Sequence, residues 1–228
     1  MTYEWSPKAA YIQSLYRPWS PAAGCPAAEI SAVEQTLGLA FPDRLRRFYL
    51  AWGKHAQLTQ ADARLLNPAQ VFVQLGALHF CIENQGVGHW AIQLDTLGEA
   101  DPLVYFGYVD HLDEEGVDHW TPYYPLSSFL DALALGHAFA GGSACGGISA
   151  APLDASQRAL LQQHWPPIQF NIAASKLKPR ADSIWRIHGS PGLALEQGVT
   201  GELWAAAGDI LSLDRLQQLL KLNWKTRW

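Results

Sequence analysis

The chain has 228 residues, of which 49% are hydrophobic and only 16% are charged, and its net charge is −5. This composition excludes an intrinsically disordered chain, which combines low hydrophobicity with high net charge. No segment approaches the roughly 18 consecutive apolar residues of a membrane-spanning helix, and the first residues show no basic and apolar pattern from which we would expect an export signal. Three scattered cysteines, Cys25, Cys81 and Cys145, are typical of a reducing compartment. We therefore expect a soluble, cytoplasmic, globular protein.

Residues 1–26 are rich in Trp, Tyr and Pro and are predicted to form an aromatic N-terminal arm with one short helix from Pro7 to Tyr16. The next segment predicts a helix over Ala27–Leu37, because Pro26 precedes its first turn and Gly38 suits its C-terminal end. A second helix should begin at residues 41–43 and end at Gly53. Together these residues indicate a helical start to the first domain.

From residue 71 the hydrophobic period changes from helical to alternating. Residues 71–75 and 78–82 read as two strands of a hairpin joined at Gly76 and Ala77. Further strands are expected over residues 89–94 and 103–109, followed by an acidic segment and an aromatic stretch at residues 118–124. Ser127 or Ser128 should cap the next helix. Because helices and strands segregate along the chain, the fold class is predicted to be α+β with a mostly antiparallel, mixed sheet and helices packed on one face.

The Gly-rich segment 141–152 is predicted to be a linker between a domain at residues 27–140 and a C-terminal α+β extension at residues 153–228. The extension should contain a helix over residues 154–163, several short strands and a closing helix over residues 213–222 capped by Ser212. Because so short a segment buries little surface alone, we expect it to pack on the first domain or extend its sheet. Its predicted core residues are Ile184, Trp185, Ile187, Leu203, Trp204, Leu216 and Leu220.

Charge is distributed unevenly. No Lys or Arg occurs between Arg64 and Arg158, whereas that interval contains eleven Asp and Glu residues. A negatively charged surface repels nucleic acid and accelerates association with basic partners. The alternative interpretation is an acidic face that serves only solubility.

Motifs that would support catalysis are incomplete. The sequence Gly86–Ala91 matches G-x-G-x-x-A, but a strand is predicted after it where a dinucleotide site needs a helix. The segment Gly141–Cys145 has Cys where a nucleophile elbow needs Gly. His111 and His119 lack a recognised metal-ligand spacing, and the strand residues His79 and His89 are interpreted as structural. The sequence therefore predicts no catalytic residues, no metal site and no cofactor.

The opening of the first domain carries a recognisable pattern: Leu37-Gly38 ends one helix, Phe41-Pro42 follows, and the second helix carries aromatics such as Phe48 and Tyr49. This pattern resembles the SMI1/KNR4 (SUKH) superfamily. The later segments Asp101–Tyr105 and Leu126–Leu130 agree, so the resemblance covers about residues 27–140. It departs from the family pattern at Trp52, where Asn is usual.

This resemblance implies a non-catalytic immunity-type protein of bacteria that binds and neutralises a toxin, often a nuclease. We expect a basic protein toxin as the partner and neither nucleic acid nor membrane. A general protein-interaction scaffold and a small metal-dependent hydrolase using His111 and His119 remain alternatives. The expected partner-binding residues are acids in a turn with aromatics beside them, because crowded unpaired acids must stay exposed. They are Asp110, Asp113, Glu114, Glu115, Asp118, Trp120, Tyr123 and Tyr124.

Overall fold

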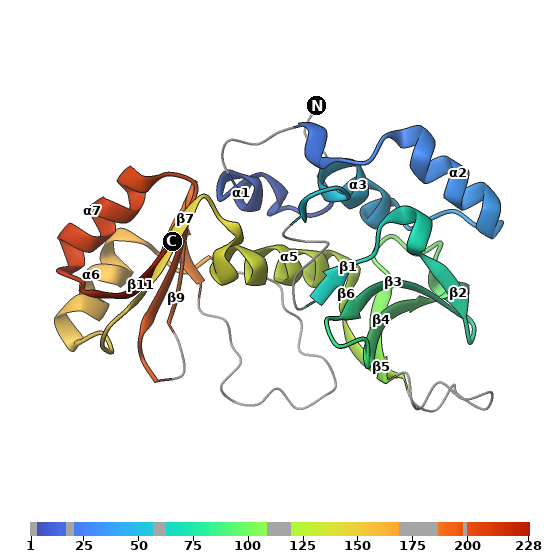
Figure 1. The fold of residues 1–228 in the computed structure, drawn as a ribbon. Coiled ribbons are helices and arrows are strands. Elements are labelled where there is room, and N and C mark those ends of the chain that lie inside the picture. Colours follow the sequence, from blue (N-terminus) through green and yellow to red (C-terminus); the bar gives the residue numbers. More distant parts are fainter. Residues whose placement is uncertain (1–3, 17–20, 57–62, 109–119, 169–186, 198–199) are drawn as a thin grey trace. The chain divides into compact units, whose positions relative to one another are not determined.

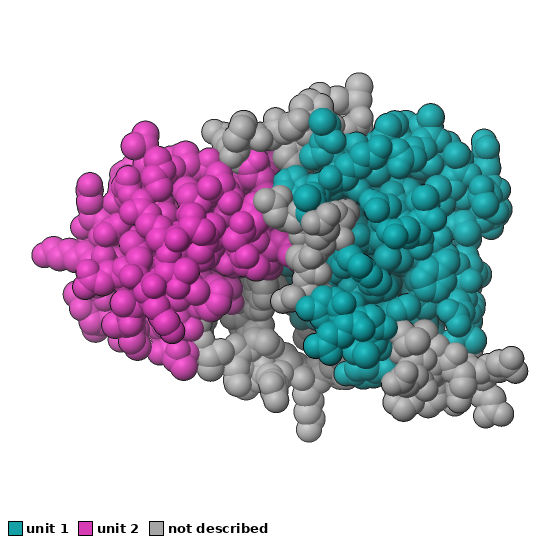
Figure 2. All heavy atoms as spheres, in the orientation of Figure 1, with its two compact units in different colours: residues 1–7, 20–133, 172–178 teal, residues 8–19, 134–171, 179–228 magenta. Residues whose placement is uncertain are grey.

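The computed structural model describes the chain except for residues 1–3, 17–20, 57–62, 109–119, 169–186 and 198–199 (Figure 1). The chain divides into two compact units. Unit 1 comprises residues 1–7, 20–133 and 172–178, and unit 2 comprises residues 8–19, 134–171 and 179–228 (Figure 2). Each unit contains α-helices and one antiparallel sheet, so the predicted α+β class is confirmed.

The helices of unit 1 form where the sequence predicts them. After the short η1 (Pro21–Ala23), α2 (Ala27–Leu37) ends at Gly38, whose φ of 69° lies in the left-handed region that glycine adopts readily. The helix α3 (Asp43–Trp52) begins after Pro42, and Asp43 suits the positive end of its dipole. Its inner face buries Leu45, Phe48, Tyr49, Ala51 and Trp52.

Unit 1 contains a six-stranded sheet, sheet 1 (Figure 1). Its strands are β1 (Ala63–Leu65), β2 (Phe72–Gln74), β3 (Ala77–Glu83), β4 (Gly88–Gln93), β5 (Leu103–Tyr108) and β6 (Thr121–Pro125), with short helices η2 (Pro68–Gln70) and η3 (Leu94–Thr96) between them. β1 and β2 both pair with β3, and β4, β5 and β6 follow in order. The predicted β2–β3 hairpin is confirmed. It closes through Leu75 and Gly76, whose φ values of 49° and 70° fit a two-residue type I′ loop.

The N-terminal segment is divided between the units. Trp5 is fully buried in unit 1, where its ring meets Phe48 edge-on at a centroid distance of 5.0 Å. Its indole N–H donates to Asp131 Oδ1 at 3.0 Å, and the Ser6 hydroxyl donates to the same oxygen at 2.6 Å. The following helix, α1 (Ala9–Ser14), belongs to unit 2. Trp5 and Ser6 are therefore part of the core of unit 1, whereas Glu4 and Pro7 are exposed.

The helix after β6, α5 (Leu126–His137), contains the division between the units, which falls between Leu133 and Ala134. The predicted N-cap of this helix, Ser127 or Ser128, is wrong, because the helix already begins at Leu126. Ser127 lies inside the first turn, and the carboxylate of Asp101 accepts hydrogen bonds from the Ser127 backbone N–H at 2.8 Å and from its hydroxyl at 2.6 Å. A carboxylate 26 residues earlier thus satisfies the helix terminus, which local sequence cannot indicate.

Unit 2 contains a five-stranded sheet, sheet 2, in the order β11-β7-β10-β9-β8. Its strands are β7 (Cys145–Ser149), β8 (Ile187–Ser190), β9 (Leu193–Gln197), β10 (Leu203–Ala207) and β11 (Trp224–Arg227), preceded by the π-helical turn η6 (Ala138–Gly142). The helices α6 (Ala155–His164) and α7 (Ile210–Leu220) contribute Leu161, Leu213 and Leu216 to the core with sheet 2. The N-cap of α7 is Asp209 and not the predicted Ser212. The Asp209 carboxylate accepts a hydrogen bond from the backbone N–H of Ser212 at 2.9 Å.

Residues 141–152, predicted as a linker, contain the strand β7, which pairs with both β10 and β11. Glycines weaken a strand unless other groups fill the space beside them. A Cβ on Gly146 would lie 2.5 Å from the Trp228 ring, and one on Gly147 would lie 2.8 Å from the Trp224 ring. The two tryptophans therefore pack directly on the glycines of β7.

The C-terminal extension builds its own sheet with β7. Of the two predicted arrangements, packing on the first domain or extending its sheet, the second is therefore wrong. Of its predicted core residues, Ile187, Leu203, Leu216 and Leu220 are buried and Trp204 is half-buried. Ile184 and Trp185 lie outside the described residues.

Candidate interaction surface

Five aromatic side chains gather near one end of sheet 1. Trp90 of β4 lies opposite Phe106 of β5, and Gly88 lies opposite Tyr108, so these rings share one face of the sheet. Ring centroids are 5.1 Å apart for Trp90 and Phe106 and 5.0 Å apart for Phe106 and Tyr108. On β6, Tyr123 lies 6.3 Å from Trp90 and 4.4 Å from Tyr124. We call Trp90, Phe106, Tyr108, Tyr123 and Tyr124 the aromatic cluster.

Exposure increases along the aromatic cluster from the core outward. Its inner rings contact Phe129 of α5, which is buried and lies 5.7 Å from Trp90 and 6.1 Å from Tyr123. Trp90, Phe106, Tyr123 and Tyr124 are half-buried, and Tyr108 is 53% exposed. Aromatic rings that are anchored on one side and accessible on the other are typical of interface hot spots.

A glycine makes room for this arrangement. A Cβ at Gly88 would lie 2.5 Å from the Phe106 ring, so a larger residue would displace that ring. The preceding residue, Val87, is 43% exposed and lies at the same end of the sheet as Tyr108. The accessible apolar surface therefore includes the β3–β4 turn as well as the aromatic cluster.

Sheet 1 carries few charged side chains. In its six described strands, the charged residues are Arg64 and Glu83. Burial is the main cause that raises the pKa of Tyr123 above its usual value, with the neighbouring Tyr124 second, so the Tyr123 hydroxyl keeps its proton at neutral pH. The aromatic cluster is uncharged, and the charges nearest in sequence lie in the segment between β5 and β6.

The predicted partner-binding residues have different outcomes. Tyr123 and Tyr124 belong to the aromatic cluster. Trp120 is only 9% exposed and packs with Ala77 and Ala91, and a Cβ on Gly107 would lie 2.9 Å from its ring. These neighbours place Trp120 on the other face of sheet 1, because Gly107 and Phe106 are consecutive on β5. Asp110, Asp113, Glu114, Glu115 and Asp118 lie outside the described residues.

Trp90 and Phe106 were not among the predicted partner-binding residues. Their signal in the sequence is the recurrence of an aromatic at every second position towards the end of β5, at Phe106 and Tyr108, opposite Trp90 on β4. Such spacing places side chains on one face of a strand. Sequence alone does not show that this face remains partly accessible.

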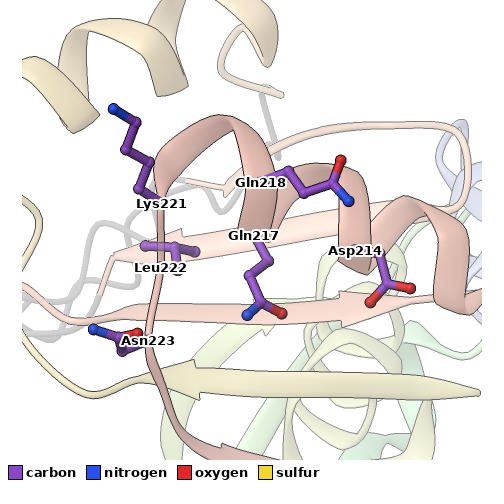
Figure 3. A pocket seen from close by; sticks show the side chains of 6 residues that line it. All are labelled: Asp214, Gln217, Gln218, Lys221, Leu222 and Asn223. Carbon is purple, nitrogen blue, oxygen red and sulfur yellow. The ribbon is translucent and has the colours of Figure 1, made fainter.

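Unit 2 carries an open polar pocket of about 430 Å³ beside the C-terminal end of α7 (Figure 3). Its lining residues are Asp214, Gln217, Gln218, Lys221, Leu222 and Asn223. Gln217 Oε1 already accepts hydrogen bonds from the Trp224 indole at 2.9 Å and from Arg227 at 3.3 Å, and Asp214 pairs with Arg227. These contacts tie β11 to α7, which is a structural role.

Metal and membrane sites were also sought in the described part of the chain. No three His, Cys, Asp or Glu side chains in it are grouped closely enough to hold a metal ion. His111 and His119, the metal ligands of the hydrolase alternative, lie outside the described residues. None of the described helices has the length and apolar character needed to cross a bilayer.

Comparison with known proteins returned no match to any protein-family model, curated protein or solved structure. The aromatic cluster is therefore interpreted from its own geometry and from the neighbouring sequence.

Proposed function

We propose that this chain is an immunity-type protein that binds and neutralises a cognate basic toxin, such as a nuclease. The observation that carries the proposal is the aromatic cluster, which is partly accessible at the end of sheet 1 from which the acid-rich segment continues. The resemblance of residues 27–140 to the SMI1/KNR4 superfamily supports the same class of function.

The charge of the segment next to the aromatic cluster indicates which kind of partner would bind. The segment between Tyr108 and Trp120 contains Asp110, Asp113, Glu114, Glu115 and Asp118 and no Lys or Arg. Acids of this density attract the basic groove with which a nuclease binds nucleic acid, and complementary charge mainly raises the rate and specificity of association. The aromatic cluster would supply the apolar contact that slows dissociation.

The role is one of binding and needs no catalytic residue, cofactor or metal. It would be exercised in the cytoplasm of the cell that produces the toxin. Toxin and chain would form a complex in which the acidic segment and the aromatic cluster meet one continuous surface of the partner.

The decisive experiment is capture of the partner from the source organism with the full-length chain as bait, followed by cross-linking and mass spectrometry. We expect one dominant basic protein, toxic when expressed alone in a test host and tolerated when the chain is co-expressed. A captured protein that is not toxic would instead support an interaction scaffold and overturn the immunity role.

A matched pair of charge reversals then locates the surface. The variant Glu114→Lys/Glu115→Lys should associate at least about tenfold more slowly at low salt, because charge steering changes rates by 10-fold or more. The control Asp95→Lys/Glu99→Lys changes the net charge by the same amount at two exposed residues of the η3 region, and it should bind nearly as the parent does. Equal rates in both variants would place the interface elsewhere.

A further inference from the structure

Two histidine rings meet on the face of sheet 1 opposite the aromatic cluster. His79 of β3 lies opposite Ala91 of β4, and the register shifts by one residue before Ile82, which lies opposite His89. His79 and His89 are therefore diagonal neighbours across a β-bulge, an irregularity that often redirects side chains near functional sites. Their Nδ1 atoms are 3.2 Å apart.

The two rings differ in accessibility. His79 is fully buried, with Phe72 stacked on it at a centroid distance of 4.5 Å and Trp120 edge-on at 5.4 Å. His89 is half-buried. Aromatic packing thus surrounds the ring of His79, whereas His89 is partly accessible to solvent.

Hydrogen bonding accounts for the approach of the two rings. His79 Nε2 lies 3.3 Å from the carbonyl oxygen of Gln74, which can only accept, so Nε2 carries the hydrogen and Nδ1 presents its lone pair towards His89. The hydrogen between the two Nδ1 atoms therefore belongs to His89, and a metal ion held between them would take its place.

The spacing fits a shared metal ion. With Zn–N bonds of about 2.0–2.1 Å, two nitrogen ligands at a tetrahedral angle lie about 3.3–3.4 Å apart, close to the separation of the two Nδ1 atoms. We propose that His79 and His89 form a two-histidine site for one divalent transition-metal ion of the zinc class, bound between their Nδ1 atoms. Water or an external ligand takes the remaining coordination positions.

The described residues contribute no third His, Cys, Asp or Glu ligand to this cluster, so the coordination sphere keeps positions for other molecules.

The test is titration of the chelator-treated full-length chain with Zn²⁺ by calorimetry. We expect one equivalent to bind the parent chain and at least about tenfold weaker binding by His89→Gln, since even loss of groups that support metal ligands costs that much. The control His164→Gln removes an exposed histidine of unit 2 and should bind as the parent does. Circular dichroism should show that the variants keep the parent fold, which the partial exposure of His89 favours.

Two further arms make the result decisive. The double variant His111→Gln/His119→Gln should retain Zn²⁺, and Co²⁺ should give a visible absorption band with the parent chain that disappears with His89→Gln. Absence of stoichiometric binding by the parent chain would overturn the proposal. Unchanged binding by His89→Gln would also overturn it, as would loss of binding only in the His111→Gln/His119→Gln variant.

Discussion

Sheet 1 and sheet 2 belong to the same structural class but differ in the side chains that they place in a row across the strands. In sheet 1, Trp90 and Phe106 pair across β4 and β5 and remain half-buried. In sheet 2, one row consists of Gly146, Ala206, Ala194 and Gly189, directly opposite one another on β7, β10, β9 and β8, and all four are buried.

The small residues of sheet 2 let other parts of unit 2 approach the backbone closely. The Tyr11 hydroxyl of α1 donates to the Leu193 carbonyl at 2.8 Å, and the Ser14 hydroxyl accepts from the Gly192 N–H at 2.6 Å. Trp228 lies on Gly146 at the other end of the row. Sheet 2 thus uses this face for packing within unit 2, whereas sheet 1 leaves aromatic surface partly accessible to solvent.

The largest expected effect concerns the aromatic core of unit 1. Trp5→Ala should lower the free energy of unfolding by about 3–5 kcal/mol, because it leaves a cavity and removes a hydrogen bond to the buried Asp131. Hydrogen exchange by mass spectrometry should show the loss of protection in peptides of unit 1. Equal loss of protection in unit 2 would show that the two units unfold together.

The control for that experiment is Trp5→Phe, which keeps one aromatic ring but removes the indole N–H and part of the buried ring system. It should cost less than Trp5→Ala because the phenyl ring keeps part of the packing. A similar cost for both variants would show that the retained ring contributes little.

An intermediate effect is expected in the small-residue row of sheet 2. Gly189→Ala should destabilise unit 2 by about 1–3 kcal/mol, because its Cβ would lie 2.2 Å from the Leu193 carbonyl oxygen and 2.6 Å from the Tyr11 hydroxyl. Gly98→Ala is the matched control, since nothing lies within 4 Å of the added Cβ. Denaturant unfolding should show a larger loss of stability for Gly189→Ala than for Gly98→Ala. Equal losses would contradict the close packing around Gly189.

The smallest effect depends on pH. Glu196 of β9 is partly buried, and this burial, with Glu202 as a second cause, raises its pKa from 4.5 to about 7. A carboxyl group with a raised pKa in the folded state stabilises the fold below pH 4.5, and this contribution is lost as the pH rises through about 7. Glu196→Gln should therefore be more stable than the parent chain at pH 8 by about 1 kcal/mol, a value reduced for solvent screening.

Urea unfolding at pH 5 and pH 8 measures this difference, which should shrink at the lower pH. Glu99→Gln, at an exposed position, is the control and should show no such dependence. If Glu196→Gln changed the free energy of unfolding by the same amount at pH 5 and pH 8, this would contradict a raised pKa of Glu196.

Local sequence predicted the elements whose signals lie within a few residues. Residues 27–37 form α2 with Gly38 at its end, as predicted. The β2–β3 hairpin also followed from local chemistry, although its turn lies at Leu75 and Gly76, one residue before the predicted Gly76 and Ala77. In each case capping, turn preference and hydrophobic period act on neighbouring residues, so they can be read without knowing the fold.

The candidate surface was only partly visible in the sequence. Tyr123 and Tyr124 were predicted, but the contribution of Trp90 and Phe106 depends on cross-strand pairing between β4 and β5. The burial of Trp120 depends on Gly107, which admits its ring on the opposite face. Periodicity places side chains on two faces of a strand, but it does not say which face the rest of the chain covers.

The sequence by itself determined the α+β class, most helices and strands, and the acid-rich interval without Lys or Arg. Only the tertiary structure decided that the Gly-rich segment becomes β7, that Asp101 supports α5, and that His79 meets His89. These features depend on partners distant in sequence, such as Trp224 and Trp228 on the glycines of β7. Contacts of that kind form when the chain folds and leave no periodic pattern in the segment itself.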